Sequence, residues 1–250
     1  MKTSTRRIVS LILNVLIVVS TIYVYRDATV YSWRFFTNLS NVLAACTSLI
    51  MVIFTILELI RGRKGTAAEK PYWVSVIRLF AAVCMTLTFV IVAIFLSPMD
   101  VIHGRSYFGG FSGQLFHMHF LTPWLTIATF VLTDGPDKKK LVPSVALIPV
   151  AAYGIAYAIS VIFQKRWPDF YGFTFGGNPL LSILMAIGIM LLSWGLVDGT
   201  CNFTSERINL LINIGYQDTV NLFKSQGLHP VSSFWFTDPE PIFEKSVFED

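Results

Sequence analysis

Two residues in apolar parts of the chain have side chains that could together perform acyl chemistry. They are Thr37, near the start of one apolar stretch, and His119, in the first half of another. A threonine hydroxyl becomes a nucleophile when a neighbouring base takes its proton, and an imidazole has the right basicity near neutral pH. We therefore predict Thr37 as the nucleophile and His119 as the general base of a site for acyl chemistry, either hydrolysis or acyl transfer to another lipid.

The polar residues around Thr37 share one face of a predicted helix. That face, with the spacing i, i+3, i+4, i+7 and i+11, consists of Thr37, Ser40, Asn41, Ala44 and Ser48. Polar side chains inside a membrane need a partner or a cavity, so we expect this face to point into a helix bundle, with Ser40 in the pocket. The amides of Asn38 and Asn41, or N–H groups of the first helical turn, are candidate oxyanion stabilisers.

His119 begins a similar stripe in a second predicted helix. The stripe has the spacing i, i+3, i+7, i+10 and i+14 and consists of His119, Thr122, Thr126, Thr129 and Thr133. Thr122 and Thr126 are therefore predicted pocket residues. His117 lies about 200° away from the start of this stripe around the helix. We expect His117 at the level of the lipid headgroups, and it stays a candidate for the base or for a supporting residue.

Simpler roles exist for the same residues. Thr37 or Asn38 could cap the helix that begins there, and on sequence alone this interpretation is favoured. The threonines that follow His119 suit close packing of helices. The alternative function is a non-catalytic membrane protein that binds or transports a lipid or a small solute on the same polar face. An ion-coupled transporter is disfavoured, because Asp, Glu, Lys and Arg are absent from the middle of every apolar stretch.

The composition indicates that membrane helices hold these residues. Of the 250 residues, 54% are hydrophobic and 14% are charged, and the mean hydropathy is +0.63, whereas soluble domains have about 25% charged residues. A bilayer core is crossed by about 20 helical residues. Six stretches without Asp, Glu, Lys or Arg reach at least 18 residues: Ile8–Tyr25, Phe35–Leu57, Leu79–Met99, Ser106–Thr133, Leu141–Gln164 and Phe170–Val197. We predict an all-α integral membrane protein with a bundle of six transmembrane helices.

The distribution of basic residues predicts the orientation. With the N-terminus in the cytoplasm, the inner side has ten basic residues and the outer side has five, as the positive-inside rule requires. We therefore expect both termini in the cytoplasm, the site near the outer leaflet, and the cell membrane as the location. Basic residues precede the first stretch, as in a signal peptide, but no cleavage site follows it, so we expect a retained helix.

Two parts of the chain are expected, a transmembrane domain over residues 1–198 and an acidic cytoplasmic tail over residues 199–250 with one or two short helices. The three cysteines have no metal-type spacing, so we predict no disulfide, no metal site and no cofactor. The sequence has no basic cluster with interleaved aromatic residues, so we do not expect nucleic acid as a partner. The expected partners are membrane lipids or fatty-acid esters.

The apolar helices contain two motifs of a known family. The sequence SWRFFT from Ser32 to Thr37 resembles the Trp-basic-Phe-x-Thr segment of the androgen-induced-gene and androgen-dependent TFPI-regulating proteins and of their bacterial relatives. The sequence LFHMH, which ends at His119 and is followed by Pro123, resembles the second motif of that family. The six-helix plan is similar too, over residues 5–200.

The resemblance implies a transmembrane threonine hydrolase that cleaves fatty-acid esters of hydroxy fatty acids. It implies Thr37 as the nucleophile and His119 as the base. The animal proteins have H-x-x-H where this chain has H-x-H, which keeps His117 as an alternative base.

Overall fold

The computed structural model describes residues 3–26, 28–61, 71–133 and 143–202. These residues form helices and turns, and no strand occurs among them. Five helical segments are long and apolar enough to cross a membrane: Thr5–Tyr25, Phe36–Ile60, Tyr72–Ile102, Gly113–Leu132 and Val145–Phe163. The chain is therefore an all-helical, multi-pass membrane protein, as its composition predicts.

The sixth apolar stretch forms α8 (Pro179–Asn202). Its apolar helical part, Leu180–Leu196, is at the lower limit of the length that crosses a bilayer core, about 17 residues. The sequence predicts a start at Phe170, but residues 170–178 form turns. Gly172, Gly176 and Gly177 have positive φ in these turns, a conformation that glycine adopts without steric cost.

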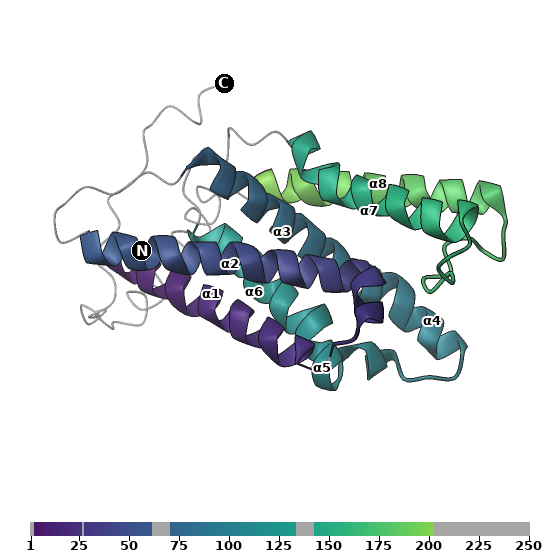
Figure 1. The fold of residues 1–250 in the computed structure, drawn as a ribbon, viewed down its shortest axis with the longest axis horizontal. Coiled ribbons are helices and arrows are strands. Elements are labelled where there is room, and N and C mark those ends of the chain that lie inside the picture. Colours follow the sequence, from purple (N-terminus) through teal and green to yellow (C-terminus); the bar gives the residue numbers. More distant parts are fainter. Residues whose placement is uncertain (1–2, 27, 62–70, 134–142, 203–250) are drawn as a thin grey trace, which may run out of the picture. The chain divides into compact units, whose positions relative to one another are not determined.

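The helix α3 (Tyr72–Ile91) is the central element (Figure 1). It packs against α2 (Phe36–Arg61) and α6 (Thr122–Thr133), which also contact α1 (Thr3–Tyr25). It also packs against α7 (Ile148–Ala158) and α8, which contact each other. Buried apolar residues of α3, among them Leu79, Val83 and Leu87, form one core cluster with Phe130 of α6 and Val150 of α7.

Three of the membrane helices contain a π-helical turn. Val92–Leu96 joins α3 to α4 (Ser97–Ile102), His117–Leu121 joins α5 (Gly113–Phe116) to α6, and Ile159–Phe163 extends α7. A π-helical turn accommodates an extra residue and so rotates the following side chains by about 100° relative to a regular helix. Such turns therefore change which side chains share a face.

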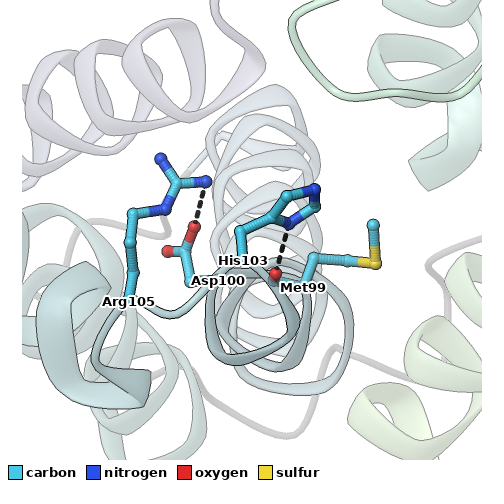
Figure 2. Close-up of polar contacts among 4 residues, drawn as sticks. All are labelled: Met99, Asp100, His103 and Arg105. Carbon is cyan, nitrogen blue, oxygen red and sulfur yellow. Dashed lines mark hydrogen bonds and ion pairs between the residues drawn. The ribbon is translucent and has the colours of Figure 1, made fainter.

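The helix α4 ends in a turn that is closed by local contacts (Figure 2). The guanidinium of Arg105 lies 2.7 Å from a carboxylate oxygen of Asp100, and the His103 Nδ1 atom lies 2.7 Å from the carbonyl oxygen of Met99. His103 and Arg105 are exposed. These contacts close the end of the helix, and the imidazole of His103 contacts its own helix.

The described residues belong to one of the two compact units of the chain, Met1–Phe203. The helix α8 continues to Asn202, beyond the domain boundary that the sequence predicts at residue 198. The predicted acidic tail over residues 199–250 lies outside the described residues from residue 203 onwards.

Candidate active site

Thr37 lies in the first turn of α2 and its side chain is buried. It is 8% exposed. The predicted inward face of this helix is confirmed, because all of its members are buried: Thr37, Ser40, Asn41, Ala44 and Ser48. The prediction that Thr37 or Asn38 caps the helix is wrong, since α2 begins at Phe36 and the residue before it, Phe35, has an extended backbone. Thr37 is therefore a helical residue whose side chain is not used to start the helix.

The cap of α2 comes instead from a distant loop. The backbone N–H of Phe36 donates a hydrogen bond of 2.9 Å to the phenol oxygen of Tyr171, which lies in the loop of residues 164–178 between α7 and α8. The hydroxyl of Tyr153 in α7 donates to the carbonyl oxygen of Arg34 at 2.7 Å. Two tyrosine hydroxyls thus hold the start of α2 next to Thr37.

Asp169 organises the loop that carries Tyr171. One carboxylate oxygen accepts hydrogen bonds from the Tyr157 hydroxyl and from the Phe173 backbone N–H at 3.0 Å. The other accepts from the backbone N–H and the hydroxyl of Thr174, at 2.8 and 2.5 Å. Burial by itself would raise the pKa of Asp169, but these hydrogen bonds outweigh burial and lower the pKa. The carboxylate therefore joins Phe173 and Thr174 of the loop to Tyr157 of α7.

A cavity of about 960 Å³ lies beside Thr37. Its walls come from α3 and the following π-helical turn, from α7 and α8, and from the loop of residues 164–178. Its lining includes Leu87, Val150 and Met190, which also belong to or pack against the core cluster. Among the described residues, the charged ones that line it are Lys165 and Asp169, both in the loop. The cavity thus extends from a polar loop to an apolar core, and its size suits a lipid-like ligand.

The predicted pocket residues Ser40, Thr122 and Thr126 are buried, but they do not line this cavity. The Ser40 hydroxyl bonds to the carbonyl oxygens of Phe36 and Thr37, at 2.9 and 3.0 Å. The Thr126 hydroxyl donates to the carbonyl oxygen of Thr122 at 2.8 Å. Because the Ser40 and Thr126 hydroxyls bond to backbone carbonyls inside the bundle, they stabilise helices and are not available to a ligand.

His119 lies in the π-helical turn before α6. Its Nδ1 atom is 2.6 Å from the carbonyl oxygen of Gly110. A carbonyl only accepts hydrogen bonds, so the contact places the proton of the neutral imidazole on Nδ1 and leaves Nε2 as the basic atom. Gly110 packs against the cavity wall, because a Cβ atom there would meet Val92, a lining residue, at 3.4 Å.

His117, at the start of the same turn, contacts α1. Its Nδ1 atom is 3.0 Å from the Ser20 hydroxyl, which is also 3.0 Å from the Thr122 hydroxyl. The imidazole packs on the ring of Tyr23 with the ring centroids 4.8 Å apart. Of the two histidines, neither is among the residues that line the cavity.

Asn41 connects the segment of Thr37 with that of the histidines. Its side-chain amide donates to the carbonyl oxygen of Thr37 at 2.8 Å and to that of Met118, between the two histidines, at 3.2 Å. The Asn38 amide donates to the carbonyl oxygen of Ser32. The Oδ1 atoms of both residues are buried, and within the described part of the chain they have no hydrogen-bond partner. Since oxyanion stabilisation needs donors, both asparagines in this arrangement position the backbone.

Tyr171 is the functional candidate that the sequence motifs do not reveal. It contacts α2 across 135 positions of sequence, and no local pattern encodes such a contact. The one sequence signal is the density of aromatic residues in its loop, where Trp167, Phe170, Tyr171 and Phe173 lie within seven positions. Their rings pack on one another and on Phe35 just before α2, at 4.6 Å for Phe35 and Phe170.

No protein-family model matches the chain, and no curated protein or solved structure matches it either. Within the described residues, no group of three or more His, Cys, Asp and Glu side chains is placed to hold a metal ion. The geometry around Thr37, His119 and the cavity is therefore the basis for assigning a function.

Proposed function

We propose that this protein is a membrane-embedded lipid ester hydrolase, with fatty-acid esters of hydroxy fatty acids as its substrate class. The observation that carries the proposal is the position of Thr37, a buried threonine on the wall of a largely apolar cavity of about 960 Å³. An acyl chain in this cavity leaves water and brings its ester group to the polar end where Thr37 lies.

In the proposed reaction, the Thr37 hydroxyl oxygen attacks the ester carbonyl carbon, and His119 Nε2 takes the hydroxyl proton. The tetrahedral intermediate then expels the alcohol, which leaves with the proton from His119. A water molecule, deprotonated by His119, attacks the acyl-threonine carbonyl carbon, and the bond to the Thr37 oxygen then breaks. The Thr37 oxygen takes the proton back from His119, which releases the fatty acid and restores the hydroxyl and the neutral imidazole. The contact of His119 with Gly110 supports this role, because in the neutral imidazole it places the proton on Nδ1 and leaves Nε2 as the atom that accepts one.

The proposed orientation follows from the charges of the loops. With both termini in the cytoplasm, α2 and the helix of His119 both start on the outer side, so the site lies under the outer leaflet of the cell membrane. The hydrogen bonds of Asn41 to Thr37 and Met118 support a common depth for the two segments.

The test is intact-mass spectrometry of the purified protein after treatment with a lipid-like fluorophosphonate. We expect one covalent adduct on the wild-type protein and none on Thr37→Ala or His119→Ala. The matched control is Thr47→Ala, which removes a buried hydroxyl from the same helix that bonds to the carbonyl oxygens of Leu43 and Ala44 and does not line the cavity. An adduct that persists in folded Thr37→Ala would refute the proposal.

A second candidate function is a non-catalytic lipid-binding or lipid-carrying protein. It is favoured by the absence of both His117 and His119 from the residues that line the cavity, since a base must come within reach of the nucleophile. This function predicts that the folded wild-type protein binds lipid but forms no fluorophosphonate adduct. The same mass measurement therefore separates the two functions.

A further inference from the structure

The phenol oxygen of Tyr171 lies at the N-terminal end of α2, beside Thr37. In the first turn of this helix, the N–H groups of Asn38 and Leu39 bond to the carbonyl oxygen of Phe35, at 3.1 and 3.2 Å. The N–H of Phe36 bonds to the Tyr171 phenol oxygen at 2.9 Å. The first N–H groups of a helix have no partner within it and carry a partial positive charge. The phenol oxygen therefore lies where the first N–H groups of α2 donate hydrogen bonds to an acceptor.

The other groups that hydrogen-bond to this phenol lie on the cavity wall. Its oxygen accepts the Phe36 N–H, and the other hydrogen-bonding groups that act on the phenol are Thr37 and Tyr153, both of which line the cavity. The hydroxyl of Tyr153 already donates its hydrogen bond to the carbonyl oxygen of Arg34. The Tyr171 O–H is thus a donor beside Thr37, on the wall of the cavity.

The phenol stays protonated under ordinary conditions. Burial raises the pKa of Tyr171, and the hydrogen bonds from Phe36, Tyr153 and Thr37 offset only part of this rise. An N–H donated to the phenol oxygen also polarises the O–H bond and strengthens it as a donor. A neutral, polarised donor next to the nucleophile is the group that an oxyanion requires.

We propose that Tyr171 is a further catalytic residue, whose phenol O–H donates a hydrogen bond to the ester carbonyl oxygen while Thr37 attacks the carbonyl carbon. This inference rests on the proposed hydrolase function. No proton leaves the phenol in the step. Negative charge accumulates on the carbonyl oxygen, and the hydrogen bond from Tyr171 shortens. When the alcohol leaves, the electron pair on this oxygen re-forms the carbonyl double bond. Tyr171 thereby takes the role that the sequence suggested for Asn38 and Asn41, whose amides donate to backbone carbonyls.

The decisive variant is Tyr171→Phe, which keeps the aromatic ring in its contacts with Phe35 and Phe170 and removes only the hydroxyl. The measurement is steady-state hydrolysis of 4-nitrophenyl octanoate by the full chain in detergent micelles. We expect kcat to fall about 10²- to 10³-fold, as for the loss of one oxyanion donor, with KM changed less than about threefold. A cap without a catalytic role would lower the melting temperature and leave kcat of the folded protein unchanged.

The matched control is Tyr25→Phe on α1, which removes a buried hydroxyl that has no hydrogen-bond partner within the described part of the chain and does not line the cavity. It should keep the wild-type kcat. If Tyr171→Phe does not fold, 3,5-difluorotyrosine at position 171 replaces it, because it keeps the hydroxyl and changes its acidity. A kcat that does not respond to this replacement would overturn the role of Tyr171.

The outcomes separate the inference from the function on which it rests. Loss of turnover in Thr37→Ala together with full kcat in Tyr171→Phe refutes the inference alone. Full turnover in Thr37→Ala refutes Thr37 as the nucleophile, and the inference with it, whereas no turnover by the folded wild-type protein refutes the hydrolase function. Loss in both variants, with the kcat effect of Tyr171→Phe unaccompanied by a KM effect, supports both.

Discussion

The Nδ1 atom of His119 and the carbonyl oxygen of Gly110 are 2.6 Å apart. Gly110 lies in the 3₁₀ turn Tyr107–Phe111, and this turn packs so closely on the preceding helix that a Cβ at Gly110 would lie 3.4 Å from Ser97 and Val92. The turn therefore fixes both the orientation and the tautomer of the imidazole. His117, in contrast, bonds to a serine of α1.

This difference between the two histidines predicts different effects of the same substitution. His119→Gln should lower kcat for a 4-nitrophenyl ester by about 10²- to 10⁴-fold, the usual contribution of a general base. His117→Gln should lower kcat by less than about fivefold, because His117 contacts α1 and its loss removes a helix contact. The reverse order of the two effects would assign the base to His117.

The cavity should set the length of the acyl chain that the protein accepts. Ala151 lines the cavity on α7, next to the core residue Val150, so Ala151→Phe should fill its apolar end. Each methylene that can no longer be buried costs about 0.8 kcal/mol, and the exclusion of three would raise KM about 60-fold for long-chain esters and little for short ones.

The control for this prediction is Ala156→Phe, on the same helix but outside the cavity lining. A series of 4-nitrophenyl esters of increasing chain length measures KM for both variants. An equal effect of Ala151→Phe on all chain lengths would show that the chain does not enter this cavity.

Asp169 should stabilise the cavity loop in a pH-dependent way. Its pKa in the folded protein is below the ordinary value of 3.8, so the unfolded state takes up a proton first as the pH falls. The stabilisation is complete well above pH 3.8 and is lost as the pH drops through the lower pKa of the folded protein. Asp169→Asn should thus lower the melting temperature by a few degrees at pH 7, and the difference should shrink below about pH 4.

Thermal unfolding followed by circular dichroism in detergent measures this difference. Asp100→Asn is the control, because Asp100 pairs with the exposed Arg105 at the end of α4, and exposed ion pairs contribute little to stability. A difference between Asp169→Asn and the wild type that is constant from pH 7 to pH 3 would exclude the ionised carboxylate as its cause.

The positions of the helices and the inward face of α2 follow from the sequence by itself. A stretch of about 20 residues without charge has one low-energy state in a membrane, a helix with all backbone groups paired. The polar side chains of that helix avoid lipid, which buries Thr37 and Asn41 as their spacing predicts. These properties depend only on local composition and helical period.

The ends of two predicted helices could not be found in this way. Residues 106–112 and 170–178 are as free of charge as the membrane helices, but they form turns. A charge count does not detect backbone conformation. Glycines with positive φ, such as Gly113 at the start of α5 and Gly172 before α8, separate turn from helix without any charged residue.

The composition of the site was decided by tertiary structure. The π-helical turn His117–Leu121 displaces His119 from the stripe of Thr122 and Thr126 that a regular helix predicts. The cap of α2 by Tyr171, and a cavity formed by α3, α7 and α8, arise from contacts between distant segments. Such contacts depend on how side-chain shapes fit once the helices pack, and neither hydropathy nor spacing encodes that fit. The sequence by itself therefore determined where Thr37 and His119 lie along their helices, and only the tertiary structure decided which groups surround them.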